Sequence, residues 1–155
     1  MRIPLALGAA AMAVVAACSK DSPTSVKTTY SATLNGANER PNPVTTTAAG
    51  TAIFTLDGNN LSYTINLTSA LTGPATASHI HVGSSSVAGP VVKGFSINTV
   101  ATGLVVTGTI DLTLPVSATV SGDSLKVLFN NGNAYVNVHT AANPGGEIRG
   151  QVAKQ

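Results

Sequence analysis

The sequence predicts an all-β domain, folded as an antiparallel sandwich or a partly closed barrel. Short segments rich in Val, Ile and Thr alternate with Gly, Pro and Asn clusters, the pattern of many short strands joined by turns. No long window carries apolar residues at the helical spacing of three and four. Only 9% of residues are charged and there is no tryptophan, and this balance also favours strands.

The clearest hairpin covers residues 51–67. Two apolar arms, 51–56 and 61–67, flank the turn sequence Asp57-Gly58-Asn59-Asn60. In the second arm Leu61 and every second residue after it share one face, as in a half-buried strand. Further strands are expected at residues 30–34, 77–82, 91–97, 104–114, 124–129, 134–139 and 147–152, and a single helical turn is conceivable at 115–120.

Residues 1–17 are expected to be an export signal. Arg2 precedes an unbroken apolar run that is too short to span a membrane, because about fifteen helical residues cover roughly 22 Å of a core ~30 Å thick. The run ends in Val15-Ala16-Ala17-Cys18, which resembles the lipobox of bacterial lipoproteins. We therefore expect Cys18 to carry lipid that holds the chain in a membrane of the cell envelope; the alternative is an ordinary signal peptide with a chance cysteine. Ser19 is unlike the aspartate that signals inner-membrane retention, so the outer membrane is expected if the cell has two.

Residues 18–29 are expected to be the lipidated cysteine and a polar, flexible tether, and residues 30–153 are expected to form one domain. Cys18 is the only cysteine, so the domain has no disulfide and no thiolate ligand. The formal net charge of +2 gives no reason to expect a nucleic-acid partner.

Polar side chains concentrate on three of the predicted strands, 77–82, 134–139 and 147–152. Residues two apart on a strand share a face, so His79 and His81 project together, with Ile80 turned into the core. If the three strands are neighbours, one face gathers the following side chains: His79, His81, Tyr135, Asn137, His139, Glu147, Arg149 and Gln151. The segment 35–43 is broken by Gly and Pro and is expected to be a surface loop with an exposed Glu39–Arg40 pair.

The chain resembles the CHRD domain family, named for chordin. The resemblance covers residues 30–151 and rests on SATLNGANERPNPV near the start, HIHVG followed by GPVV, and the closing YVNVHTAANPGGEIRGQV. The chain departs from the family in the loops, at residues 39–43 and at the serine run 84–86. The resemblance implies an extracytoplasmic Greek-key β-sandwich, superoxide-dismutase-like or immunoglobulin-like in architecture, with no established enzymatic activity.

Three interpretations of the polar face follow. The first is a non-catalytic, membrane-anchored module that binds or scaffolds an unknown envelope protein or small ligand without a cofactor; six carboxylates and no thiol leave little for an enzyme. The second is a Cu²⁺ or Zn²⁺ site formed by His79, His81 and His139, with Glu147 as a further candidate ligand and redox activity as an extension. His-x-His looks like the first copper-ligand pair of copper-zinc superoxide dismutases, but their other ligands have no counterparts here. The third is a structural network in which Tyr135, Asn137, Arg149 and Gln151 fix the strand register.

Overall fold

Antiparallel strands dominate residues 26–155, the part of the chain that the computed structural model describes. The strands are β1 Thr28–Asn35, β2 Ala49–Asp57, β3 Asn60–Ser69, β4 Ala75–Val82, β5 Val91–Gly94, β6 Gly103–Asp111, β7 Ala134–Thr140, β8 Ile148–Gln151 and β9 Ala153–Lys154. The helices are the 3-10 turn η1, Gly36–Asn38, and α1, Gly122–Asn130. The predicted signal peptide, Cys18 and most of the tether lie outside the described residues. The strand β1 begins two residues before the predicted domain boundary.

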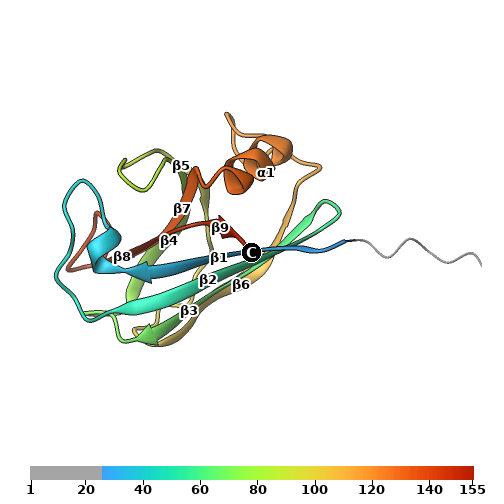
Figure 1. Cartoon of the computed structure of the whole chain (residues 1–155). Coiled ribbons are helices and arrows are strands. Elements are labelled where there is room, and N and C mark those ends of the chain that lie inside the picture. The colour runs from blue at the N-terminus through green and yellow to red at the C-terminus, as the bar shows by residue number, and fades with distance from the viewer. Residues whose placement is uncertain (1–25) are drawn as a thin grey trace, which may run out of the picture.

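The strands form one continuous sheet in the order β5-β4-β7-β8-β1-β2-β3-β6, and β9 adds to β1. The sheet curls on itself as a half-barrel, so that the β4-β7 side faces the β2-β3 side (Figure 1). Apolar side chains from both sides fill the space between them, among them Phe54, Ile65, Ile80 and Val136, all with no exposed surface. The predicted all-β, antiparallel class is confirmed.

The hairpin of β2 and β3 forms as the alternation predicts. Asp57 pairs with Asn60, which leaves Gly58 and Asn59 as a two-residue turn, and Gly58 has a φ of 60°. That backbone conformation is open to glycine at little cost. Leu61, Ile65 and Leu67 are buried on the core face.

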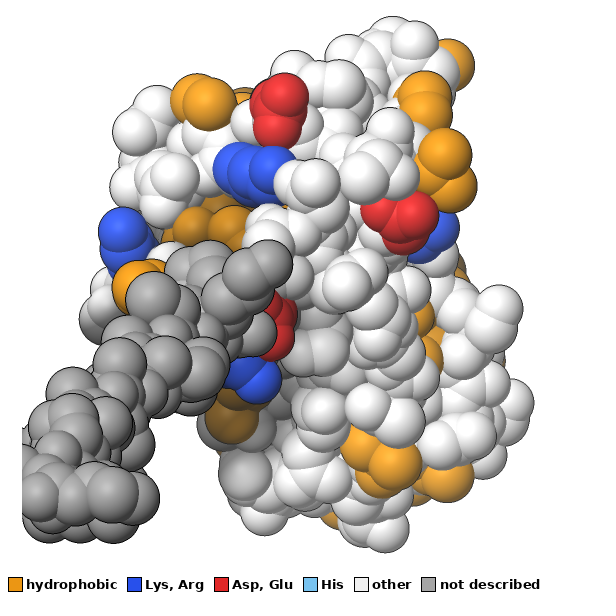
Figure 2. Space-filling model, turned by 90° about the vertical axis from the view of Figure 1, so that its right-hand side faces the viewer, with side chains coloured by type: hydrophobic (Ala, Val, Ile, Leu, Met, Phe, Trp, Pro, Cys, Tyr) orange, Lys and Arg blue, Asp and Glu red, His pale blue; other side chains and the backbone are white. Residues whose placement is uncertain are grey.

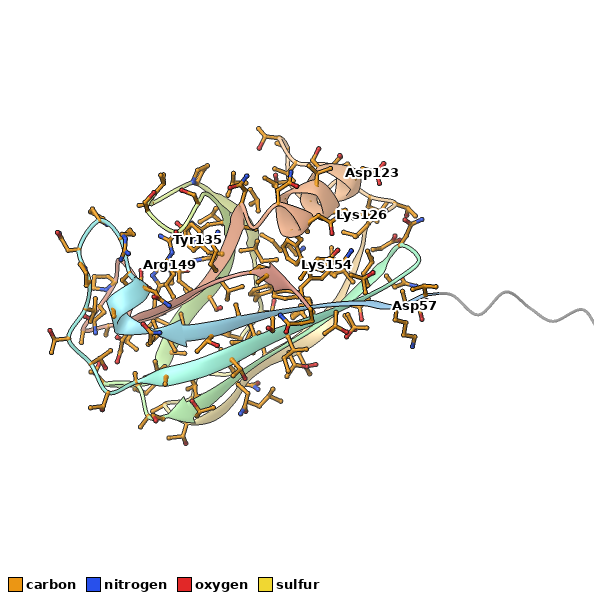
Figure 3. All side chains as sticks on the ribbon, viewed as in Figure 1. Asp57, Asp123, Lys126, Tyr135, Arg149 and Lys154 are labelled. Atoms are coloured by element: carbon orange, nitrogen blue, oxygen red, sulfur yellow. The ribbon has the colours of Figure 1, made fainter. Side chains whose placement is uncertain are left out.

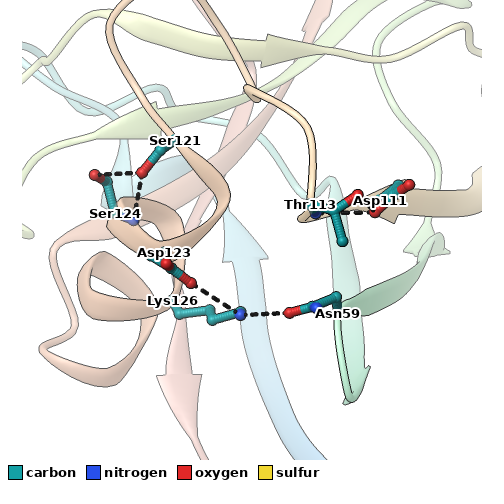
Figure 4. A network of polar contacts seen from close by, with 7 residues as sticks. All are labelled: Asn59, Asp111, Thr113, Ser121, Asp123, Ser124 and Lys126. Atoms are coloured by element: carbon teal, nitrogen blue, oxygen red, sulfur yellow. Dashed lines mark hydrogen bonds and ion pairs between the residues drawn. The ribbon is translucent and has the colours of Figure 1, made fainter.

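The sequence-based prediction is wrong at α1, because a strand was expected at residues 124–129 and a helix forms. Ser121 caps its N-terminus by accepting a hydrogen bond from the Ser124 amide at 3.1 Å. Lys126 then donates to Asn59 at 2.8 Å, which ties the helix to the β2–β3 turn (Figure 4). Residues 115–120, where a helical turn was conceivable, are not helical.

The outer surface carries few charges. In Figure 2 acidic and basic side chains are scattered singly or in small groups among uncharged ones, on the face shown. Within residues 26–155, no helix has the length and apolar character that crossing a membrane requires.

Candidate functional site

Three imidazoles meet on the outer face of β4 and β7. The two strands are hydrogen-bonded neighbours, and their register sets His79 opposite Asn137 and His81 opposite Tyr135. One ring nitrogen from each of His79, His81 and His139 lies within 4.8 Å of the other two. The predicted convergence of the three histidines is therefore present in the structure.

Two of these rings are held by main-chain carbonyls. The Nδ1 of His81 donates to the Gly89 carbonyl at 2.9 Å, and the Nδ1 of His139 donates to the Pro144 carbonyl at 2.9 Å. A carbonyl only accepts, so each Nδ1 carries the proton and, in the neutral ring, each Nε2 has a free lone pair. Both Nε2 atoms face Asn137. The Nε2 of His81 lies 3.1 Å from the Oδ1 position of Asn137, and the Nε2 of His139 lies 3.0 Å from it.

The Asn137 side chain can serve this cluster in two ways. If the Asn137 oxygen points toward the rings, the Nε2 atoms must be protonated, because two acceptors cannot form a hydrogen bond with each other. With the amide reversed, its NH₂ group donates to both lone pairs and both imidazoles stay neutral. Asn137 therefore has a donor for the empty cluster and an oxygen ligand for an occupied one.

The third ring is held more loosely. The Nδ1 of His79 lies 3.0 Å from the Nε2 of His139, the one hydrogen-bond partner found for the His79 side chain among the described residues. Burial lowers the pKa of all three imidazoles, and the neighbouring imidazoles lower those of His79 and His81 further. The cluster is therefore uncharged at neutral pH, the state in which imidazole binds metal.

A stack of planar groups supports the cluster from the β8 side. The His81 ring stacks on Tyr135 at 4.7 Å between centroids and 12° between planes. The guanidinium of Arg149, next along the sheet on β8, lies 3.4 Å from the centre of the Tyr135 ring (Figure 3). Tyr135 also bonds through its hydroxyl to Gly89, whose carbonyl holds His81.

Loops cover this polar face and keep most of its side chains from solvent. Arg149 is 1% exposed, Asn137 3% and His81 8%. The loop 83–90 lies close above: a Cβ at Gly89 would meet the Val82 carbonyl oxygen at 1.6 Å, so only glycine allows this approach. Gln151 fixes the start of the same loop by donating to the Gly83 carbonyl at 2.7 Å.

Glu147 does not join the histidines. Its backbone amide bonds to the Val138 carbonyl, and its carboxylate accepts hydrogen bonds from Thr46, Thr72 and Thr140 at 2.7 to 3.0 Å. Burial raises the pKa of Glu147, but the hydrogen bonds from these threonines together outweigh it, and the net pKa lies below the ordinary value. Glu147 therefore ties the loop before β4 to the end of β7.

Glu147→Gln is expected to lower the free energy of unfolding at pH 7 by about 2–3 kcal/mol, because the lost bonds are to a charged acceptor. A carboxyl whose pKa is lowered by folding stabilises the protein above its unfolded pKa, and this contribution disappears as the pH falls through the folded pKa. The difference in free energy of unfolding between the wild type and Glu147→Gln should therefore become smaller as the pH falls. Urea unfolding from pH 3 to 7 measures this difference. The control Asp111→Asn removes an exposed carboxylate that accepts from Thr113; an equal loss in both variants would contradict the role of burial.

Glu39 corrects a second expectation. It was predicted to be an exposed loop partner of Arg40, but it is 3% exposed and packs against Gly146, where a Cβ would meet its Oε1 at 2.5 Å. Burial raises the pKa of Glu39 to about 7, against the lowering influence of Arg149 and Arg40. Nothing in the sequence pattern around Glu39 signals this burial, since it is produced by a loop more than a hundred residues later.

Comparison with known proteins adds the family. The family model described as the CHRD domain matches residues 30–152, nearly the whole of the part that the structure describes. Searches of the curated proteins and of the solved structures give no match. The matched span contains β4, β7 and β8 with the three histidines, and the chain therefore belongs to the CHRD domain family.

Proposed function

We propose that this protein is a binding module of the cell envelope that holds one Cu²⁺ or Zn²⁺ ion through His79, His81 and His139. One observation carries the proposal: three neutral ring nitrogens from two strands lie within 4.8 Å of one another. Imidazole nitrogen is a preferred ligand of both metals. Three such ligands leave a coordination position for a fourth group.

The three ring nitrogens lie within 4.8 Å of one another, so an ion would draw the rings together. With metal–nitrogen bonds of ~2.0–2.1 Å and tetrahedral angles, ligand nitrogens lie roughly 3.3 Å apart. The Nδ1 of His79 and the Nε2 of His139 are 3.0 Å apart, so a small separation of these rings would admit an ion. Asn137 is the nearest group for a fourth position, because its amide already touches both Nε2 atoms.

The hydrogen bonds behind the rings also favour a metal. Metal-binding histidines usually donate their second ring N–H to a carbonyl or carboxylate, which fixes the tautomer and aims the free lone pair. His81 and His139 both do so, through Gly89 and Pro144. A purely structural network would explain these two rings, but it gives no role to His79, whose side chain adds one hydrogen bond at the partly exposed edge of the cluster.

The anchoring of this module rests on the sequence of the first 18 residues. A lipid on Cys18, with the short polar segment after it, would hold the domain at a membrane surface. Acyl chains contribute about 0.8 kcal/mol per buried methylene, so several chains keep a protein in the bilayer. We propose a role in binding, not catalysis, because neither a carboxylate nor a thiol joins the three histidines among the described residues. Replacing Cys18 by serine should move the protein from the membrane to the soluble fraction; membrane retention would contradict lipid anchoring.

Calorimetric titration of the purified protein with CuCl₂ and ZnCl₂ tests the metal proposal. We expect saturation at one ion per chain at pH 7.5. Binding should persist below the ordinary imidazole pKa of about 6.5 and weaken at more acidic pH, because the lowered imidazole pKa values delay competition by protons. A titration without saturable heat for either metal would contradict the proposal.

A further inference from the structure

A second polar cluster lies on the same face, beside the histidines and joined to them through the Arg149–Tyr135–His81 stack. The guanidinium groups of Arg40 and Arg149 line one small pocket of about 70 Å³ together with Asn38, Ser85 and Gln151. Tyr135 lies between this pocket and His81, since its strand, β7, runs between β4 and β8. The space is several times what one water molecule needs, which suits a ligand of a few heavy atoms.

The charges at this pocket are of one sign. Arg149 is 1% exposed, and burying a charge without a counterion is costly. The ion pairs between described residues are Lys27 with Asp57 and Lys126 with Asp123, and neither lies at the pocket. Among the described residues, the Arg149 guanidinium contacts the Ser84 carbonyl at 2.8 Å and the Tyr135 ring, neither of which is charged.

Glu39 is an acidic group that acts on Arg149, and it compensates the charge only in part. It lines a neighbouring pocket, and it forms no ion pair within 4 Å of either arginine among the described residues. Burial raises the pKa of Glu39 to about 7, so that close to half of it is protonated at neutral pH. A positive charge therefore remains at the Arg40–Arg149 pocket.

Gln151, one of the lining residues, has an uncharged acceptor without a partner. The Nε2 of Gln151 is used in bonds to three main-chain carbonyls, whereas its Oε1 is buried without a hydrogen-bond partner. A ligand that bears both negative charge and a hydroxyl group would satisfy the arginines and this oxygen together.

We propose that the pocket between Arg40 and Arg149 binds a small oxyanion, a carboxylate or a hydrogen phosphate. The planar guanidinium presents paired N–H donors that match the two oxygens of such a group. Arg149 is fixed by its stacking on Tyr135, so its donors are held in place before the ligand arrives. This site contains none of the three proposed metal ligands and needs no metal for its test.

The test follows the arginine Nε–Hε signals of the ¹⁵N-labelled, metal-free protein by NMR, during separate titrations with sodium phosphate and sodium acetate. Ionic strength is held constant with sodium chloride. We expect a saturable shift of the Arg149 signal with at least one probe. Saturation with phosphate alone indicates a ligand that uses Gln151, and saturation with acetate indicates a carboxylate site.

Three variants sharpen the result. Arg40→Gln, at a half-buried position, should weaken binding about tenfold, and Lys154→Gln, which removes an equal charge at an exposed position on β9, should leave it unchanged. Glu39→Gln should strengthen binding several-fold, because it removes a carboxylate that competes for the same arginines. Non-saturable shifts with both probes, or equal affinity losses in Arg40→Gln and Lys154→Gln, would overturn the proposal.

Discussion

Replacing Phe129 by alanine is expected to destabilise the protein by about 3–5 kcal/mol, the range for truncating a buried aromatic residue. Phe129 is 1% exposed and makes edge-to-face contacts with Tyr30 at 5.2 Å and Phe54 at 5.0 Å between ring centroids. Through them α1 closes one end of the core formed by β1 and β2. Because small domains have only about 5–15 kcal/mol of stability, the variant should be near the limit of folding.

Val127→Ala serves as the control for Phe129→Ala. Val127 is on the same helix, but 56% of its surface is exposed, and we expect a change within about 0.5 kcal/mol. Both variants are compared with the wild type by urea unfolding followed by circular dichroism. Similar stabilities for Phe129→Ala and the wild type would show that α1 is not part of the core.

The second large effect is expected for metal binding in His79→Ala. Loss of one of three ligands should lower the affinity for Cu²⁺ or Zn²⁺ at least about 100-fold, beyond what loss of a supporting group costs. The free energy of unfolding without metal should change little, because the His79 side chain contributes a single hydrogen bond, to His139. Calorimetry gives the affinity, and urea unfolding gives the stability of the same samples.

This combination separates a metal site from a structural network. In His81→Ala both the metal affinity and the free energy of unfolding should fall, since His81 is buried and bonds to Gly89 and Asn137. Thr76→Ala, exposed on the same strand, should change neither. A His79→Ala protein that binds metal as tightly as the wild type would remove His79 from the site, and with it the proposed arrangement of three ligands.

The hairpin and the neighbouring strands could be predicted because their residues alternate with the period of a sheet. Leu61 and Ile65 needed no tertiary information to be placed in the core. The helix α1 could not be predicted in this way, since the run Leu125–Phe129 is too short for its period to be decisive. The better signal was local: Ser121 followed by Asp123 starts a helix, and Asn131-Gly132 ends one.

The candidate site was predictable to the extent that strands determine it. Residues two apart placed His79 beside His81, and the pairing of β4 with β7 brought His139 to them. What covers this face was not predictable, because the loops at 36–48, 83–90 and 141–146 are positioned by contacts distant in sequence. Those contacts bury Glu39 and Arg149, and they direct Glu147 to threonines from other loops instead of to the histidines.

Anomalous diffraction from a crystal of the protein soaked in ZnCl₂ or CuCl₂ tests the central claim most directly. If the three histidines bind a metal, we expect one strong peak at ~2.0–2.1 Å from the Nδ1 of His79 and the Nε2 atoms of His81 and His139. The hydrogen bonds to Gly89 and Pro144 should be retained. A cluster without a peak, with His79 and His139 still in direct contact at about the observed 3.0 Å, would contradict it.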